Sequence, residues 1–146
     1  NLADRVSRLA FAREALRPLL AGLRVSSIIE TEPVDVLGPQ ARFLNAAAVG
    51  EPSLAPQDLL AALLALERQR GRERPHPGAP RTLDLDLILF GDLVLDAPGL
   101  HVPHPRFRAR RFVLGPLAEI APSLVDPVTK RTVAQLLSDL DRGKTG

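Results

Sequence analysis

Leucine alternates with polar residues through the segment TLDLDL, residues 82–87. Side chains of a β-strand point alternately to its two faces, so this spacing predicts a strand with Asp84 and Asp86 on one face and leucines on the other. Two carboxylates therefore point the same way from a strand whose opposite face is apolar.

A tight turn follows this segment. Gly91 and Asp92 form a two-residue connection that is typical of a type II′ turn. The turn predicts an antiparallel hairpin whose strands are residues 83–90 and residues 93–95.

Helical and strand-like patterns follow one another along the rest of the chain. The predicted helices are residues 3–21, 56–71, 108–120 and 133–140, and the predicted strands are residues 24–31 and 42–49. We expect Pro18 to kink or shorten the first helix, Gly22 to end it, and Gly115–Pro116 to interrupt the third. These elements predict an α+β fold, a ferredoxin-like sandwich of one mainly antiparallel sheet with helices packed on it.

The length and composition suit a single domain with one site, because 45% of the 146 residues are apolar. No run approaches the roughly 18 consecutive apolar residues of a membrane-spanning helix, and the first residues lack the order of a signal peptide. We therefore expect a cytoplasmic protein. Cysteine is absent, so any metal has to bind oxygen or imidazole ligands.

Arginine residues gather in two clusters, although the net charge is only +2. The clusters are Arg68, Arg70, Arg72, Arg74 and Arg81, and Arg106, Arg108, Arg110 and Arg111. A planar guanidinium suits bidentate phosphate binding, so the clusters indicate an anionic partner. A solvated basic face is the alternative, and the clusters alone do not decide between the two.

The two aspartates are candidate metal ligands. On a strand, the Cα atoms of Asp84 and Asp86 would lie about 6.6 Å apart, close enough for their oxygens to bind one or two divalent ions, and such oxygens favour magnesium. The alternative is a charged edge strand that resists aggregation, because a bare D-x-D motif is weak. Nearby Arg81, His104 and Arg110 favour a site for polyphosphate transfer.

The usual nucleotide-binding signatures are missing: the chain has no P-loop, no G-x-G-x-x-G motif and no kinase catalytic loop. Residues 71–80 are rich in Arg, Pro and Gly and are a candidate mobile lid. The loop at residues 32–41 is long for a structural turn, and loops of this length often serve binding.

Aromatic residues are few, with five Phe and no Tyr or Trp. Phe43 and Phe112 stand beside polar or basic residues, and flat ligands bind well between two rings. Asn45 would share a strand face with Phe43, where its amide could read the edge of a heterocycle. A core role remains the alternative for each Phe taken alone.

The stretch HPGAPRTLDLDLILFGD, residues 76–92, resembles the signature of the hydroxymethyldihydropterin pyrophosphokinase family. Three further stretches agree with the family in order and spacing, so that the resemblance spans nearly the whole chain. They are FLNAA at residues 43–47, VPHP at residues 102–105 and RFVLGPLAEIAP at residues 111–122.

The resemblance implies that the β,γ-pyrophosphate of ATP is transferred to the hydroxymethyl group of the dihydropterin in folate biosynthesis, leaving AMP. Two magnesium ions would be bound by Asp84 and Asp86, while the pterin would contact Thr31, Val34, Phe43, Asn45 and Phe112. ATP would contact Glu67, Arg72, Arg74, Arg81, His104 and Arg110, and the catalytic residues would be Arg72, Arg81, Asp84 and Asp86. The loops at residues 33–41 and 71–80 would be lids that close over both substrates before chemistry. We expect a monomer that binds neither nucleic acid nor a membrane.

This sequence departs from the family pattern in three places. Gly78 stands where an aromatic residue is often found, and Phe43 stands where a Tyr is common. Asn1–Leu2 resembles the end of the family's Gly-Ser-Asn-Leu turn, and the chain has no Met. We therefore expect the first strand of this single pyrophosphokinase domain to be missing from the sequence.

Two other functions are considered. A non-catalytic ferredoxin-like module could bind RNA or a phosphorylated ligand, but Asp84 and Asp86 would repel a phosphate backbone unless metals were present. A sugar-nucleotide transferase also uses D-x-D, but the chain is short for its usual nucleotide-binding domain.

Overall fold

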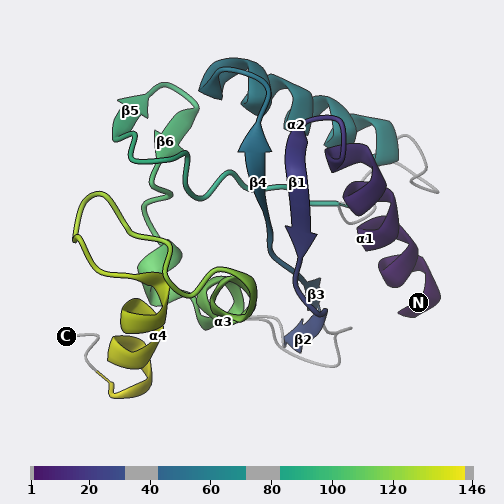
Figure 1. Cartoon of the computed structure of the whole chain (residues 1–146). Coiled ribbons are helices and arrows are strands. Elements are labelled where there is room, and N and C mark those ends of the chain that lie inside the picture. Colours follow the sequence, from purple (N-terminus) through teal and green to yellow (C-terminus); the bar gives the residue numbers. More distant parts are fainter. Residues whose placement is uncertain (1, 32–42, 72–82, 144–146) are drawn as a thin grey trace. The chain divides into compact units, whose positions relative to one another are not determined.

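Figure 1 shows the computed structural model of the chain, which describes residues 2–31, 43–71 and 83–143. The chain divides into two compact units. Unit 1 comprises Asn1–Leu23 and Gly50–Leu87, and unit 2 comprises Arg24–Val49 and Ile88–Gly146.

Unit 1 contains two helices that contact each other, α1 (Leu2–Leu16) and α2 (Pro56–Gly71). Pro56 suits the first turn of α2, where its fixed φ is already helical and its missing N–H costs no hydrogen bond. The buried side chains of the two helices are Ala12, Leu16, Leu59 and Leu63. The guanidinium of Arg70 lies 5.2 Å from the ring centre of Phe11 and adds a cation–π contact between the helices. The predicted helix at residues 56–71 is therefore confirmed.

The first helix is shorter than predicted. It ends at Leu16, because Pro18 disfavours the helical conformation of the residue before it. Strand β1 (Leu20–Val25) follows, so the prediction that Gly22 ends the helix was wrong. Gly22 lies inside β1 with a φ of 64°, a left-handed conformation that glycine adopts without steric cost.

Strand β4 (Ala48–Pro52) is hydrogen-bonded to β1 in a two-stranded sheet (Figure 1). Gly50 allows the two strands to approach closely. A Cβ atom at position 50 would lie 2.7 Å from the Cβ atom of Leu20 and 3.0 Å from the carbonyl oxygen of Ala21. Any side chain at this position would therefore push the strands apart.

In unit 2, strands β2 (Ile29–Thr31) and β3 (Phe43–Asn45) pair antiparallel. The two long strands predicted at residues 24–31 and 42–49 are thus each divided in two. Ser26 supplies the physical reason.

Ser26 directly follows β1 in the chain, before β2 begins, and its side chain is buried. Its hydroxyl forms hydrogen bonds that backbone groups would form in a regular strand ladder. Its backbone N–H donates to the carbonyl of Ala47 at 2.8 Å, and its Oγ accepts from the N–H of Ala47 at 2.8 Å. The same Oγ donates to the carbonyl of Ser27 at 2.8 Å. These bonds satisfy the polar groups at the break between the strands.

The predicted turn at Gly91 and Asp92 is present, but the hairpin strands lie later in the chain. The N–H of Leu93 donates to the carbonyl of Phe90 at 3.0 Å, and Gly91 has a φ of 57°. Residues 83–90, however, form no strand, so the prediction of a strand there was wrong. The antiparallel hairpin is instead formed by β5 (Leu95–Ala97) and β6 (Leu100–Val102).

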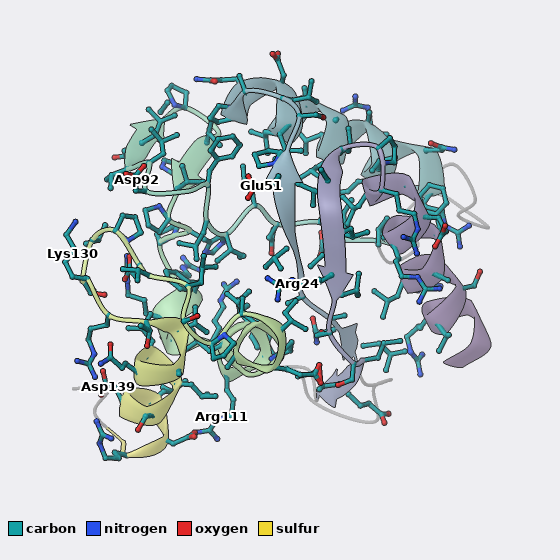
Figure 2. All side chains as sticks on the ribbon, viewed as in Figure 1. Arg24, Glu51, Asp92, Arg111, Lys130 and Asp139 are labelled. Atoms are coloured by element: carbon teal, nitrogen blue, oxygen red, sulfur yellow. The ribbon has the colours of Figure 1, made fainter. Side chains whose placement is uncertain are left out.

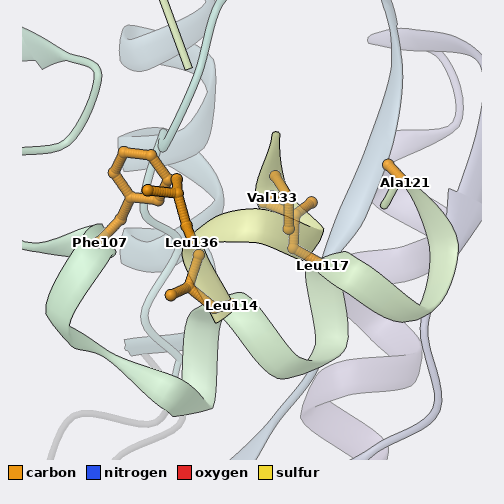
Figure 3. Packing of buried hydrophobic residues seen from close by; sticks show 6 residues of the cluster. All are labelled: Phe107, Leu114, Leu117, Ala121, Val133 and Leu136. Atoms are coloured by element: carbon orange, nitrogen blue, oxygen red, sulfur yellow. The ribbon is translucent and has the colours of Figure 1, made fainter. Parts of the chain in front are cut away.

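Unit 2 has an apolar core made by a 3₁₀ turn and two helices (Figure 3). These elements, η1 (Phe107–Ala109), α3 (Arg111–Ile120) and α4 (Val133–Asp141), pack on one another. The buried residues of this core are Phe107, Leu114, Leu117, Ala121, Val133 and Leu136. A capping box starts α4, in which the Thr132 hydroxyl accepts from the N–H of Gln135 and the Gln135 side chain accepts from the N–H of Thr132.

Helix α3 continues through Gly115 and Pro116, so the predicted interruption was wrong. Pro116 has no N–H to donate to the carbonyl of Phe112, which weakens the helix at this point. The ring of Pro116 is buried, and this burial offsets the lost hydrogen bond.

The described residues form four α-helices and small antiparallel strand pairs, which confirms the predicted α+β class. Within those residues, no helix is both long enough and apolar enough to cross a membrane.

Candidate active site

The aspartate segment of unit 1 has the alternation predicted from the sequence. Asp84 and Asp86 are exposed, Leu83 is buried, and Leu85 and Leu87 are half-buried. The leucines fix the segment against apolar neighbours, so that both carboxylates are held on the wet side.

The backbone between the two aspartates is anchored by helix α2. The N–H of Leu85 donates to Oε2 of Glu67 at 2.6 Å. A carboxylate acceptor makes this a charge-assisted hydrogen bond, which is stronger than the neutral bond of a sheet ladder. The backbone donor of Leu85 is thus satisfied by a side chain and not by a neighbouring strand.

The donor set fits a hard divalent ion that also binds substrate. No group of three or more His, Asp or Glu side chains that could hold a metal occurs among residues 2–31, 43–71 and 83–143. Asp84 and Asp86 would thus provide two carboxylates and leave the remaining positions to water and phosphate oxygens. Magnesium is bound in this way in many phosphoryl-transfer sites.

The strand pair of unit 2 brings together three positions that the resemblance assigns to pterin. Thr31 is the register partner of Phe43, and Asn45 is the partner of Ile29. Positions 43 and 45 both lie on strand β3, two residues apart. Helix α3, which carries Phe112 in its first turn, contacts both strands.

Two polar contacts tie the chain before β2 to the end of α3. The N–H and the hydroxyl of Ser27 donate to the Glu119 carboxylate, each at 2.6 Å, and these hydrogen bonds lower the pKa of Glu119. The guanidinium of Arg24 donates to the carbonyl of Ile120 at 2.7 Å (Figure 2). These contacts fix α3 against the strands that carry Phe43 and Asn45.

Arg110 and Phe112 lie together at the start of α3. The guanidinium carbon of Arg110 is 5.6 Å from the ring centre of Phe112, within the range of a cation–π contact. The carbonyl of Arg110 accepts from the N–H groups of Val113 and Leu114, which places Arg110 at the N-cap of the helix. A cation and an aromatic face are therefore joined at one helix end.

His104 is held in a defined tautomer. Its backbone N–H donates to the carbonyl of Ile88 at 2.7 Å, and its Nδ1 accepts from the N–H of Arg106 at 3.1 Å. A neutral imidazole carries one ring proton, so an accepting Nδ1 places that proton on Nε2. An imidazole N–H is a donor of the kind that binds phosphate oxygens.

The second arginine cluster divides into residues with different partners. Arg108 binds the fully buried Asp126, and Arg111 forms an ion pair with Asp141. Arg110, by contrast, stacks on Phe112. The solvated basic face considered above is thus wrong for Arg108, whose role is structural.

Asp126 was not identified from the sequence. Its carboxylate accepts from Arg108, from the hydroxyl of Thr129 at 2.7 Å and from the N–H of Val128 at 3.0 Å. Aspartate often bonds to backbone and hydroxyl groups two or three residues later in turns, and the segment Asp126–Thr129 carries that signal.

Several predicted site residues lie outside the described residues, namely Val34, Arg72, Arg74 and Arg81, as do the side chains of Thr31 and Phe43. The two predicted lids fall almost wholly in the same stretches. Of the remaining site residues, unit 1 contains Glu67, Asp84 and Asp86, and unit 2 contains Asn45, His104, Arg110 and Phe112.

The fold and these residues define an α+β protein with carboxylates, guanidinium and imidazole groups suited to phosphate chemistry. The sequence model of the 7,8-dihydro-6-hydroxymethylpterin-pyrophosphokinase family matches residues 1–122. The chain belongs to this family.

Curated relatives agree with this assignment. A protein of Synechocystis sp. named 2-amino-4-hydroxy-6-hydroxymethyldihydropteridine pyrophosphokinase is 44% identical over 124 residues, which are 84% of this chain and 64% of the relative. A Pseudomonas aeruginosa protein of the same name is 46% identical over 126 residues, 81% of this chain and 78% of the relative. The mitochondrial folate synthesis bifunctional protein of Arabidopsis thaliana is 40% identical over 130 residues, 86% of this chain and 23% of the relative. The match thus spans slightly less than two thirds of the Synechocystis protein, and these relatives do not favour the RNA-binding alternative.

Proposed function

We propose that this protein transfers the β,γ-pyrophosphoryl group of ATP to the hydroxymethyl oxygen of 6-hydroxymethyl-7,8-dihydropterin in folate biosynthesis. The pterin oxygen forms a new bond to the β-phosphorus, and the bond between the β-phosphorus and the oxygen that bridges it to the α-phosphate breaks. AMP leaves with that oxygen. The hydroxyl proton is lost to solvent. The observation that carries the proposal is the paired exposure of Asp84 and Asp86 in a chain that belongs to this family.

Asp84 and Asp86 are proposed to bind two magnesium ions together with phosphate oxygens of ATP. When bound, magnesium would neutralise charge that develops on the non-bridging oxygens during transfer. Leu85, the residue between them, is half-buried and its amide is bound to Glu67, which supports a defined backbone at the two carboxylates before substrate binds.

Phosphate binding is proposed for His104 and Arg110, together with Arg72, Arg74 and Arg81. The Nδ1 contact with the Arg106 amide supports this role for His104, because it directs the ring proton to Nε2. Arg110 keeps its charge at any physiological pH, and its position at the N-cap of α3 adds the positive end of a helix dipole.

Pterin binding is proposed for Phe43 and Phe112 by stacking, and for Asn45 by hydrogen bonds to the heterocycle, with Thr31 and Val34 beside them. The register of β2 and β3 and the contact of both strands with α3 support this arrangement. Glu67 is proposed to lie beside the nucleotide as well.

We further infer a ferredoxin-like sandwich, a single cytoplasmic domain that acts as a monomer, and lids at residues 33–41 and 71–80 that close before chemistry. The α+β class and the helices that pack within each unit support the architecture.

The deciding experiment is an assay of AMP release from ATP with magnesium, with and without hydroxymethyldihydropterin. Pterin-dependent AMP formation with stoichiometric pterin diphosphate is the expected result. ADP as the product, or AMP release that ignores the pterin, would overturn the proposal. Replacement of ATP by its β,γ-methylene analogue distinguishes transfer of the intact pyrophosphoryl group from sequential phosphate transfers. Intact transfer still releases AMP from this analogue, whereas sequential transfers are blocked because the β,γ bridge cannot break.

A further inference from the structure

The carboxylate of Glu67 and the amide between the two aspartates meet across an 18-residue separation in sequence. Glu67 lies near the C-terminal end of α2, is half-buried, and accepts from the N–H of Leu85 at 2.6 Å. Both residues belong to unit 1. The helix is anchored in turn by buried Leu59 and Leu63, so the acceptor is held by a packed element.

This bond acts on the peptide plane that joins Asp84 to Leu85. A fixed peptide plane restricts ψ of Asp84 and φ of Leu85, which are two of the four backbone torsions between the Cα atoms of Asp84 and Asp86. The flanking leucines fix which face the aspartates occupy. The Glu67 contact restricts their relative orientation on that face.

The structure does not favour a ligand role for Glu67 itself. One of its oxygens is engaged with the backbone, and residues 2–31, 43–71 and 83–143 contain no group of three metal-binding side chains. A third carboxylate charge near Asp84 and Asp86 would be unfavourable without metal, and the amide donor offsets part of that cost.

We propose that Glu67 is a positioning residue, which orients Asp84 and Asp86 for metal and nucleotide by holding the Leu85 amide. The proposal rests on the proposed function of the aspartate pair. The orientation of the two aspartates should therefore depend on the acceptor oxygen of residue 67 and not on its charge. Glu67→Gln should keep this orientation, because a glutamine oxygen can accept the same hydrogen bond.

The first measurement is amide hydrogen exchange at Leu85, which needs neither substrate nor metal. We expect Leu85 to be protected in the unsubstituted protein, to exchange about tenfold faster or more in Glu67→Ala, and to stay near the original rate in Glu67→Gln. Gln69→Ala, an exposed change on the same helix, is the matched control. Unprotected Leu85 in the unsubstituted protein would overturn the proposal even if no variant folds.

The second measurement is Mn²⁺ binding in the presence of a non-hydrolysable ATP analogue, together with the kinetic constants. Glu67→Ala should weaken Mn²⁺ binding about tenfold and lower kcat, with the pterin KM unchanged, and Glu67→Gln should restore both. A raised ATP KM in both variants, with Leu85 exchange unchanged, would instead assign Glu67 to nucleotide contact alone. If the unsubstituted protein releases no pterin-dependent AMP, the proposed function fails, while Leu85 exchange still decides the positioning contact.

Discussion

Arg108 and Asp126 form a two-point ion pair that links η1 to the loop before α4. Nε of Arg108 lies 2.5 Å from Oδ2 of Asp126, and Nη2 lies 3.0 Å from Oδ1. The Asp126 side chain is fully buried, and the Arg108 side chain retains 29% of its exposure. This pair holds the turn from which the chain enters α3, and Arg110 and Phe112 follow within four residues.

Replacement of Asp126 should destabilise the protein strongly. Asp126→Asn removes the charge opposite Arg108 and leaves a guanidinium without its carboxylate, and we expect a loss of about 2–4 kcal/mol in the free energy of unfolding. Asp139→Asn is the matched control, because Asp139 binds the more exposed Arg131 and Arg142 (Figure 2). This control should cost about 1 kcal/mol or less. Equal urea midpoints for the two variants would contradict the prediction.

The same carboxylate predicts a pH dependence of stability. Burial alone would raise the pKa of Asp126, but hydrogen bonds from Arg108, Thr129 and Val128 and the charge of Arg108 outweigh burial and lower the pKa from 3.8 to about 2. A lowered folded-state pKa means that the carboxylate stabilises the fold at pH values above the unfolded pKa. About 2 kcal/mol should therefore be lost as pH falls from about 4 to about 2.

Urea unfolding at a series of pH values measures this loss. Asp126→Asn cannot titrate at this position, so its stability should fall less steeply over the same range. Parallel curves for the two proteins would show that other carboxylates cause the acid sensitivity.

Replacement of Gly50 should destabilise the protein, because β1 and β4 approach closely at this position. Gly50→Ala places a methyl group 2.7 Å from the Cβ atom of Leu20, which overpacks the strand pair and should cost about 1–3 kcal/mol. Gly115→Ala is the matched control, because a Cβ atom there meets nothing within 4 Å and the position is helical. That change should raise the free energy of unfolding by up to about 1 kcal/mol. A destabilised Gly115→Ala variant would argue against the packing described for α3.

Loss of either aspartate should abolish transfer but not pterin binding. Asp84→Ala and Asp86→Ala should each lower kcat by at least about a hundredfold, because the charge on the transferred group loses its counter-ion. The dissociation constant for pterin, measured by calorimetry, should change little. Asp92→Ala, an exposed aspartate in the neighbouring turn, should keep normal turnover. Normal turnover in both Asp84 and Asp86 variants would end the metal assignment.

The sequence predicted those parts of the fold that depend on local spacing. Helix α2 follows from its leucine periodicity between Pro56 and Gly71, and the turn at Gly91 follows from its two residues. The helix predicted at residues 133–140 is also present. The predicted strand boundaries were wrong, because they depend on the hydrogen bonds between Ser26 and Ala47, which lie 21 residues apart. Pro116 failed as a helix breaker because burial of its ring depends on tertiary packing.

The candidate site shows the same limit. Alternation was sufficient to place Asp84 and Asp86 on the exposed side of their segment. The contacts that hold the site residues, Glu67 with Leu85 and Arg108 with Asp126, each join residues 18 apart in the chain. Sequence spacing alone could not reveal which donor would meet which acceptor across such loops.

The stacking of Arg110 on Phe112 also makes this helix end suitable for optical detection. The chain contains neither Trp nor Tyr, so Phe112→Trp would introduce a single indole fluorophore, with a guanidinium about 5–6 Å from the ring centre. Indole emission responds to nearby charge, and a ligand that draws Arg110 away from the ring would change the emission wavelength. Ligand binding near Arg110 could thus be followed by the indole fluorescence of a single substituted residue.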